Sequence, residues 1–404
     1  MKKRIRTIFI CMLLLVMLAG FGRTALSPKD INTYENRYAE KMKPLSGQTF
    51  ASGDFQDSLD LALADQVQAS EALKRVYNRM RSDFMRKFLP LLTGQGSTKP
   101  ADVNPNNYDY VALDGTDVRL FGPEHICIMP RPLDNAAKAL IDSHSANTNA
   151  VINRHPEIDF YAYYVEKDID IDFRTGEKIP AGEYIFDKLN IPAGNTAKFV
   201  ISNAASFDYY FYMTDHHWNY LGSNLAYQQL HALLSMEGPV LKPDSEVYNL
   251  GKFGGSRATG SYSQFSEDFK AYKYSFPSFL VTQNGEDFED YGWQDRYLTG
   301  EDVAPLSYGN FYGYDTGETT FNRGSYGSNK LLVIGDSYDN ALLKLLASHY
   351  DELYSVDLRY YKEYFGVDFD FDSYVAEHGI TKVLLIGNRE LFMADDFLLD
   401  KEVR

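Results

Sequence analysis

The sequence predicts an α/β fold with a mainly parallel central sheet. Residues 331–334 are an unbroken apolar run with the β-branched pair Val333 and Ile334, which is typical of a strand buried on both faces. Further strands are predicted at 158–165, 353–356 and 382–386, and helices at 133–153, 222–236, 340–348 and 371–378. Helices that alternate with strands indicate parallel pairing, because each crossover returns the chain to the same end of the sheet.

The N-terminus predicts export. The basic residues Lys2, Lys3, Arg4 and Arg6 precede an apolar run at 8–20, which is the layout of a secretory signal and is short for a membrane span. Small residues after the run allow cleavage, so residues 1–25 are interpreted as a signal peptide or an N-terminal anchor. We therefore expect an extracytoplasmic protein, secreted or anchored at the cell envelope, that contacts a membrane only through this segment.

Charge and cysteine content narrow the possible partners. The chain has 40 Lys and Arg against 56 Asp and Glu, a net charge of -16, so it should repel a polyanion and nucleic acid is not an expected partner. Of the two cysteines, Cys11 lies within the export segment. Cys127 is expected to be a buried, small apolar group rather than a reactive thiol.

The chain is expected to divide near residue 107. Apolar residues keep helical spacing from 54 to 90, and a loop rich in Gly, Pro, Ser and Asn follows, so 26–107 are interpreted as an N-terminal helical segment and loop. Residues 108–404 then form the α/β domain, which begins with a hairpin around Asp114-Gly115. Two stretches with many turn signals, 167–197 and the aromatic 238–329, are expected to be insertions.

A candidate nucleophile lies just after the strand predicted at 331–334. Gly335 permits a sharp turn, and Asp336 and Asp339 can accept hydrogen bonds from the free amides of the next helix. Such a turn holds Ser337 at the carboxyl end of a strand, where backbone N–H groups converge. The pattern favours Ser337 as a nucleophile, and the alternative is that it only caps the helix.

Suitable partners for a serine nucleophile occur at two other predicted strand ends. Asp215 and His217 follow a strand predicted at 207–213, and Asn388 follows a later one, while parallel sheets place their sites at these ends. Side chains two residues apart project on the same side, so Asp215 can reach the Nδ1 of His217 while His216 points away. A serine needs such an imidazole base and an acid that orients it. Alternatively, Asp215 caps the next helix and Asn388 ties a turn.

Candidate substrate-binding residues lie beside these groups. Trp218 and Tyr338 adjoin the base and the nucleophile and are expected to line the site, while Arg359 could orient a substrate or be held in a salt bridge. Aromatic residues between 291 and 326, among them Tyr312, suit stacking on sugar rings, and the alternative is that they pack the insertion against the sheet. No phosphate loop, dinucleotide fingerprint or zinc-ligand spacing is present, so we expect no cofactor and no metal.

Three short motifs carry a family resemblance. They are Gly335-Asp336-Ser337-Tyr338, Asp215-His216-His217-Trp218 and Gly387-Asn388, and they resemble the SGNH hydrolase superfamily. More closely, the chain resembles the DHHW family and the related alginate-type polysaccharide O-acetyltransferases, from about Glu35-Asn36-Arg37 to the C-terminus. The resemblance implies an SGNH-like (flavodoxin-like) three-layer sandwich. Its block order would be circularly permuted, because the Asp and His precede the Ser.

The resemblance also implies roles and a reaction. Ser337 would be the nucleophile, His217 the general base and Asp215 the orienting acid, with the oxyanion held by the Ser337 backbone and by Asn388. The implied activity is that of an exported O-acetyltransferase or acetylesterase on an extracellular or cell-wall polysaccharide, with a membrane acyl-donor protein as a partner for transfer. The acidic balance favours a neutral or amino-sugar polymer. The alternative is a catalytically silent carbohydrate-binding or exopolysaccharide export component that retains the fold.

Overall fold

The computed structural model describes residues 31–32, 37–39, 41–53, 55–56, 58–59, 62, 66, 111–112, 118–121, 125–260, 265–288, 294–299, 307–324 and 327–400. The chain divides into two compact units, Met1–Thr98 and Lys99–Arg404. The expectations for the export segment at 1–25 and for the loop at 93–107 lie outside the described residues. Among the residues that are described, no helix is both long and apolar enough to cross a membrane.

The described part of the first unit is small. A two-stranded antiparallel pair joins β1 (Ile31–Asn32) to β2 (Arg37–Tyr38). Helix α2 (Gly47–Ser52) begins at Ser46, whose side chain accepts from the amide of Thr49. A polar side chain in this position satisfies one of the amides that a helix leaves free at its start. The sequence analysis did not predict this helix.

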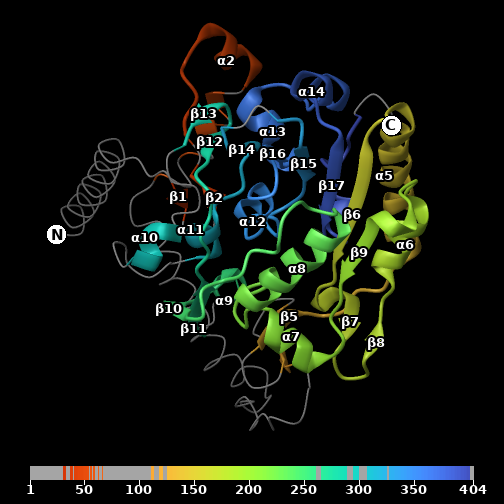
Figure 1. The fold of residues 1–404 in the computed structure, drawn as a ribbon, viewed down its shortest axis with the longest axis vertical. Helices are drawn as coiled ribbons and strands as arrows, with labels where there is room; N and C mark the ends of the chain where they lie inside the picture. Colours follow the sequence, from red (N-terminus) through yellow and green to blue (C-terminus); the bar gives the residue numbers. More distant parts are fainter. Residues whose placement is uncertain are drawn as a thin grey trace, which may run out of the picture. The chain divides into compact units, whose positions relative to one another are not determined.

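The second unit is built around an eight-stranded sheet (Figure 1). Its strands, in sheet order, are β13 (Glu286–Asp287), β12 (Leu280–Gln283), β14 (Glu318–Asn322), β16 (Glu352–Val356), β15 (Lys330–Ile334), β17 (Lys382–Gly387), β6 (Asp159–Val165) and β9 (Thr196–Phe199). The strands from β16 to β9 pair in parallel, whereas β14, β12 and β13 add an antiparallel extension. The mainly parallel central sheet is therefore confirmed.

Side chains of the central strands alternate between two separate cores. In β15, Leu331 and Val333 belong to one hydrophobic cluster, and Leu332 and Ile334 belong to the other. This alternation follows from the two-residue repeat of a strand, and it explains why the run is apolar without interruption. The strand is covered on both faces, as its sequence predicted.

Helices cover both faces of the sheet and complete a three-layer arrangement (Figure 1). One face is covered by α5 (Asn135–Arg154), α6 (Ala181–Lys188), α13 (Leu358–Phe365), α14 (Phe371–His378) and the 3₁₀ turn η4 (Leu391–Met393). The other face is covered by α7 (Ala204–Tyr210), α8 (Tyr220–Leu233), α11 (Tyr308–Tyr312), α12 (Leu343–Ala347) and the hairpin of β10 (Val247–Phe253) with β11 (Glu267–Tyr272).

Smaller elements complete the second unit. They are β3 (Val111–Ala112), β4 (Val118–Phe121), β5 (His125–Ile128), η1 (Asp168–Asp170), β7 (Ile171–Asp172), β8 (Glu177–Lys178), η2 (Ala193–Asn195), α9 (Ser256–Gly260) and α10 (Gln294–Thr299). The antiparallel pairing of β3 with β4 confirms the predicted hairpin, although its turn lies outside the described residues. Cys127 in β5 is fully buried, as expected.

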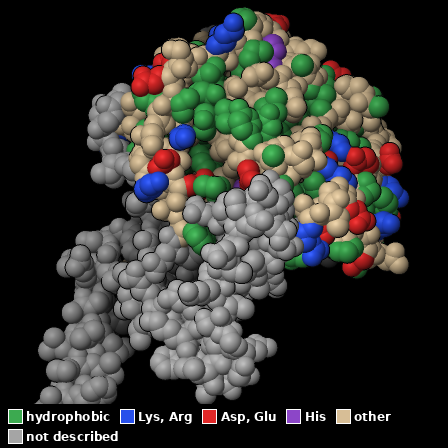
Figure 2. Space-filling model, turned by 90° about the horizontal axis from the view of Figure 1, so that it is seen from below, with side chains coloured by type: hydrophobic (Ala, Val, Ile, Leu, Met, Phe, Trp, Pro, Cys, Tyr) green, Lys and Arg blue, Asp and Glu red, His purple; other side chains and the backbone are tan. Residues whose placement is uncertain are grey.

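One face of the molecule combines charged margins with an apolar centre. Figure 2 shows hydrophobic side chains, tyrosine included, gathered between side chains of both charges. In the second unit as a whole, the exposed apolar side chains include Tyr209 of α7, which is 56% exposed, and Val247 of β10, which is 41% exposed. Single apolar residues at a surface are common, so exposure alone assigns no function to them.

Three predictions about elements were wrong or incomplete. The strand predicted at 207–213 is mostly helix α7, because Asn203 and Ser206 cap each other's backbone amides and start a helix that the aromatic sequence had obscured. Residues 167–197 are not only an insertion, since they supply α6 and the start of β9. Likewise, 238–329 contain β12, β13 and β14, which extend the main sheet.

Candidate active site

Three side chains that are distant in sequence form one hydrogen-bonded series. The Oγ of Ser337 lies 2.7 Å from Nε2 of His217, and Nδ1 of the same ring lies 2.6 Å from Oδ1 of Asp215. His217 and Asp215 are almost fully buried, whereas Ser337 is half-buried. A hydroxyl, an imidazole and a carboxylate in this order can generate a serine nucleophile.

The turn after β15 presents Ser337. A β-carbon at Gly335 would lie 2.4 Å from Oδ2 of Asp339 and 3.0 Å from the carbonyl of Ile386, so the close approach requires glycine there. Asp336 accepts from the amide of Tyr338 and stabilises the turn. The helix predicted at 340–348 begins later, at Leu343, because the residues just before it form hydrogen-bonded turns.

The base and its acid lie in a loop between α7 and α8, not at the end of a strand. An isolated antiparallel bridge joins Phe211 to Trp218, and the amide of Tyr212 donates to the carbonyl of His217. This tight loop brings Asp215 and His217 to the same side, as the spacing of two residues predicted. The predicted placement at the carboxyl end of a sheet strand was therefore wrong for this pair. The pair nevertheless meets Ser337, because His217 lies within hydrogen-bond distance of its hydroxyl.

The stretch 238–329 holds this loop in place. Glu267 of β11 accepts hydrogen bonds from the amide of Met213 at 3.1 Å and from the amide and hydroxyl of Thr214 at 2.7 Å each. The amide of Ser256 donates to Oδ2 of Asp215 at 2.7 Å. A β-carbon at Gly255 would lie 2.4 Å from Cβ of Asp215, so only glycine fits against the acid.

The surroundings keep Asp215 ionised. Burial alone would raise the pKa of Asp215, but its pairing with His217, with His216 and the Ser256 amide nearby, holds that pKa well below its usual range. The ionised carboxylate can accept a hydrogen bond from Nδ1–H of His217, and Nε2 of the same ring then faces the hydroxyl of Ser337. A general base requires this arrangement of the two ring nitrogens.

A pocket of about 460 Å³ opens onto Ser337. Its wall combines the apolar side chains Ile128, Leu391 and Ala394 with polar and charged residues. The polar and charged members are Lys167, His216, Ser256, Arg257, Asp336, Ser337, Tyr338, Arg359, Asn388 and Glu390. The volume is within the range of small-ligand sites, so the pocket can admit a small molecule beside Ser337.

Asn388 reaches the pocket from the end of β17. Its side-chain amide donates to Oδ2 of Asp336 at 3.1 Å, and its carbonyl oxygen accepts from the amide of Glu390 at 2.8 Å. Asn388 thus ties the turn, which is one of the two alternatives, and it also lines the pocket. Its donation to an oxyanion stays a prediction.

The four candidate substrate-binding residues separate into two groups. Tyr338 and Arg359 line the Ser337 pocket, although Arg359 already pairs with Asp357 at 2.9 Å and with Asp315 at 3.2 Å. Trp218 has no exposed surface and packs edge-on to Tyr338, so the structure places it beneath the pocket.

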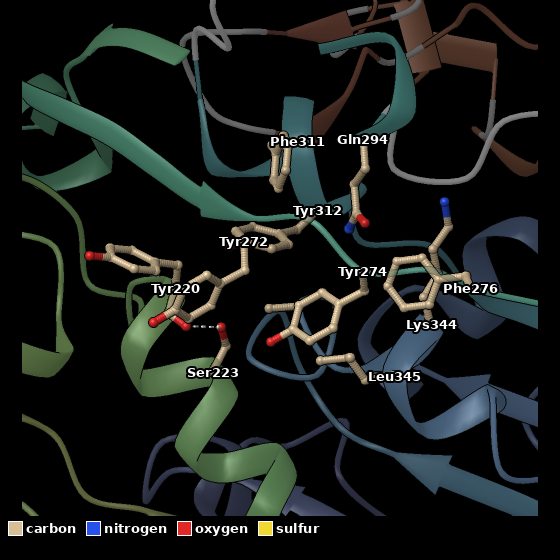
Figure 3. Close-up of a pocket in the computed structure, with 11 residues that line it drawn as sticks. Tyr220, Ser223, Tyr272, Tyr274, Phe276, Gln294, Phe311, Tyr312, Lys344 and Leu345 are labelled. Atoms are coloured by element: carbon tan, nitrogen blue, oxygen red, sulfur yellow. Dashed lines mark hydrogen bonds between the residues drawn. The ribbon is translucent and has the colours of Figure 1, made fainter. Parts of the chain in front are cut away.

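Tyr312 lies in a different, smaller pocket between α8, α11 and α12, which Figure 3 shows in close-up. That cavity has a volume of about 20 Å³, which is room for little more than one water. Tyr308, Phe311, Tyr312 and Tyr314 are all at least 94% buried. For these residues, packing of the insertion, and not stacking on sugars, is the alternative that the structure supports.

His216 lies at the pocket margin. Its Nδ1 is 2.8 Å from the hydroxyl of Ser256, and its ring is one third exposed. Burial, reinforced by the nearby His217, lowers the pKa of His216 well below its usual range, so the ring is neutral near pH 7. The ligand atoms of Asp215, His216 and His217 lie within 4.8 Å of one another, but both imidazole Nδ1 atoms already have hydrogen-bond partners.

Some residues that build the site carried no sequence signal. Glu267, Gly255 and Ser256 lie in a stretch that the sequence described only as irregular, and they contact Asp215 or its neighbour across 41 to 53 residues of chain. Tyr308 was recognised as an aromatic residue, but its contact with His217 was not foreseen. Periodicity and motifs report local structure, so they do not reveal such contacts.

Comparisons with known proteins identify a family and a shared fold. A family model described as DHHW protein matches residues 144–356. A DHHW family protein from Eubacterium siraeum is 18% identical with a TM-score of 0.53, and the match covers 72% of this chain and 95% of that one. Bacillus cereus PatB1, solved with a sulfonyl adduct, is 18% identical with a TM-score of 0.54, covering 73% of this chain and 100% of that one.

A third solved structure is too dissimilar to support any inference about this chain. The O-acetyltransferase domain of Pseudomonas putida AlgJ is 11% identical with a TM-score of 0.40, and the match covers 69% of this chain and 92% of that one. A search of curated proteins finds no match to the chain. At these identities, the likeness to the two nearer structures shows a shared fold.

Proposed function

This chain belongs to the DHHW protein family, and on that premise we propose that it is a serine-dependent acyl-transfer enzyme for O-acetyl groups of an extracellular or cell-wall polysaccharide. Its fold is SGNH-like, with a mainly parallel central sheet. The observation that carries the proposal is the unbroken series from Ser337 through His217 to Asp215, at 2.7 and 2.6 Å. Distances of this size are within reach for proton transfer without rearrangement.

In the first half of the reaction, Nε2 of His217 takes the proton of the Ser337 hydroxyl as Oγ attacks the acetyl carbonyl carbon. The carbonyl oxygen becomes negatively charged, and the backbone N–H of Ser337 with the remaining amide N–H of Asn388 stabilises it. The bond from the carbonyl carbon to the donor oxygen then breaks. His217 returns its proton to that oxygen, which leaves an acetyl ester on Ser337.

In the second half, an acceptor hydroxyl attacks the acetyl ester while His217 removes the acceptor's proton. The bond to Oγ of Ser337 breaks, and the proton returns to the serine. A sugar hydroxyl as acceptor gives O-acetyl transfer, and water gives hydrolysis. Asp215 remains ionised throughout and stabilises the imidazolium that forms in each half.

The charge around the pocket supports a neutral or amino-sugar polymer as substrate. Each cation in the wall already pairs with a carboxylate, Lys167 with Glu390, Arg257 with Asp168, and Arg359 with Asp357. A strongly anionic glycan would therefore meet an acidic protein without free positive charge to attract it. An extracytoplasmic location and a membrane acyl-donor protein as partner belong to the same proposal, and the export pattern at the N-terminus supports them.

The test uses the protein without residues 1–25 and an acetyl ester of p-nitrophenol. We expect wild type to release p-nitrophenol and Ser337→Ala to lose at least about a thousandfold in rate, as removal of a triad member does. Ser373→Ala is the matched control, because Ser373 is an exposed serine at the start of α14. A sulfonyl fluoride should modify wild type at Ser337, since the relative from Bacillus cereus was solved with a sulfonyl adduct.

A second measurement separates the proposal from the binding-only alternative. Acetylated and deacetylated glycans are offered to wild type and to Ser337→Ala, and both binding and turnover are measured. Turnover that depends on Ser337 supports the enzyme. Glycan binding that is equal in both proteins, with no turnover and no modification by the sulfonyl fluoride, would instead show a catalytically silent binding protein.

A further inference from the structure

The ring of Tyr308 lies flat against the imidazole of His217. The two ring centroids are 3.9 Å apart and the planes differ by 4°. The hydrogen bonds of His217 to Asp215 and Ser337 lie at its two nitrogens, so the stacked phenol contacts the ring itself and competes with neither bond. The two other described rings that contact His217 are farther from parallel, since the planes of His216 and Tyr338 are tilted by 36° and 53°.

The insertion holds Tyr308 rigidly in this position. Tyr308 is the first residue of α11, whose start is capped by the Ser307 hydroxyl, and it is 1% exposed. Its ring contacts Tyr312 of the same helix at 4.7 Å between centroids and approaches Tyr212 edge-on at 6.5 Å. A side chain packed on several sides cannot leave His217 without opening a cavity.

We propose that Tyr308 is a positioning residue for His217: its aromatic face fixes the plane of the imidazole and stabilises the imidazolium that forms when Ser337 is deprotonated. This inference rests on the proposed function, because it assigns a task to the same base. It gives the insertion at 238–329 a direct part in the reaction through α11.

The physical basis is the attraction of a cation to an aromatic face. An imidazolium is attracted by the electron-rich face of a phenol, and the attraction is larger where water is excluded, as it is at a His217 that is 1% exposed. Burial raises the pKa of Tyr308 well above its usual range, so the phenol stays neutral and its face keeps this character. An effect of this kind is worth about tenfold in the rate of a step that forms the imidazolium.

Other charged and titratable groups also act near His217. Asp215 contributes most directly, because it shares a hydrogen bond with the imidazole. The others that face the ring or its immediate neighbours are His216, Asp336, Tyr338, Lys167 and Arg257. None of them is substituted in the variants at position 308, and a ring of the same shape keeps their packing, so variants that differ only in the electronic character of this ring report on the stacked face.

The experiment therefore changes the electronic character of the ring while keeping its shape. Tyr308→Phe keeps the aromatic face, Tyr308→Leu removes it, and pentafluorophenylalanine at position 308 keeps the shape but reverses the polarity of the face. Tyr350→Leu is the matched control, because Tyr350 is also 1% exposed in the same hydrophobic cluster and is not among the residues around the triad. Each protein is assayed for ester hydrolysis across pH, and the His217 imidazole is titrated by nuclear magnetic resonance.

We expect Tyr308→Phe to lie within about twofold of wild type in kcat/KM. The Leu and pentafluorophenylalanine variants should lose about tenfold, with the pKa of His217 lower by about one unit, because loss of the face destabilises the imidazolium. Tyr350→Leu should lose stability without moving the titration. If Tyr308→Leu does not fold, the proposal is tested with the pentafluorophenylalanine protein, because that variant preserves the packing around His217.

Two results would overturn the inference. One is a His217 titration that is the same in wild type and in the pentafluorophenylalanine protein, and the other is an equal loss of rate in Tyr308→Phe and Tyr308→Leu. The titration needs no turnover, so it remains decisive if wild type proves inactive. Inactivity of wild type would refute the proposed function, whereas an unmoved titration would refute the role of Tyr308.

Discussion

Glu267 offers the most direct test of how the insertion builds the site. This partly buried carboxylate accepts from the Met213 amide through Oε2 and from both the amide and the hydroxyl of Thr214 through Oε1. Thr214 directly precedes the acid of the triad. Glu267→Gln replaces one of the two oxygens by an NH₂ group, so one of the backbone amides will face a donor instead of an acceptor.

The expected losses of stability and activity both follow from this single mismatch between two donors. A buried backbone amide that is left without a hydrogen-bond acceptor lowers the free energy of unfolding by about 1–3 kcal/mol. For a unit of this size, a loss near 2 kcal/mol lowers Tm by about 4 °C. Because the loop also carries Asp215, a small displacement should reduce kcat/KM for the acetyl ester by about ten- to a hundredfold.

Thermal unfolding and the ester assay measure the two effects on the same protein. Glu286→Gln is the matched control, because Glu286 in β13 is exposed and should tolerate the identical substitution. The reasoning is refuted if Glu267→Gln unfolds and turns over like Glu286→Gln. A loss of stability with full activity would show that Glu267 supports the fold but does not position the acid.

Two further predictions concern the turns around the triad. In Gly255→Ala the new methyl group would lie 2.4 Å from Cβ of Asp215, so activity should fall at least about tenfold in the ester assay. In the control Gly254→Ala the methyl group would meet its nearest neighbour at 3.4 Å, so activity should stay near that of wild type. Equal activities of the two variants would contradict the close packing at Gly255. Burial, reinforced by Asp336 and other nearby carboxylates, raises the pKa of Asp339 well above its usual range. The folded protein therefore holds the proton of this carboxyl more tightly than the unfolded chain does. As a result, the free energy of unfolding should decrease as pH rises above about 4. Asp339→Asn cannot titrate, so denaturant unfolding at about pH 5 and about pH 9 should show a smaller decrease than in wild type, and parallel curves would count against a proton on Asp339.

Local patterns predicted much of the second unit. The runs that became β6, β15, β16 and β17 are mostly apolar because side chains on both faces of each strand are buried, and that property is visible in the sequence. The helix predicted at 133–153 is α5, and Asp134 caps it by accepting from the amide of Ala137. Export and the partners remain predictions, because no described residue bears on them.

The triad was predicted as a set of residues but not as an arrangement. Asp215 and His217 are two residues apart, and that spacing alone allows their hydrogen bond. Their support was misjudged, because the aromatic residues at 207–213 resemble a strand until the reciprocal cap of Asn203 and Ser206 is recognised. Trp218 and Tyr312 were placed in the pocket by their proximity in sequence to the base and by their chemistry, and neither property determines burial.

The sequence by itself determined the parallel core, the turn that presents Ser337 and the choice of Ser337, His217 and Asp215 as the candidate site, because short-range patterns specify strands, turns and the pairing of near neighbours. Only the tertiary structure decided that β12 to β14 join the sheet, that Glu267 and Ser256 hold the loop of Asp215, and that Tyr308 stacks on His217. The side-chain contacts of the site join residues from 41 to 120 positions apart when the bond between His217 and Ser337 is included. They depend on packing between distant segments, which no local pattern records.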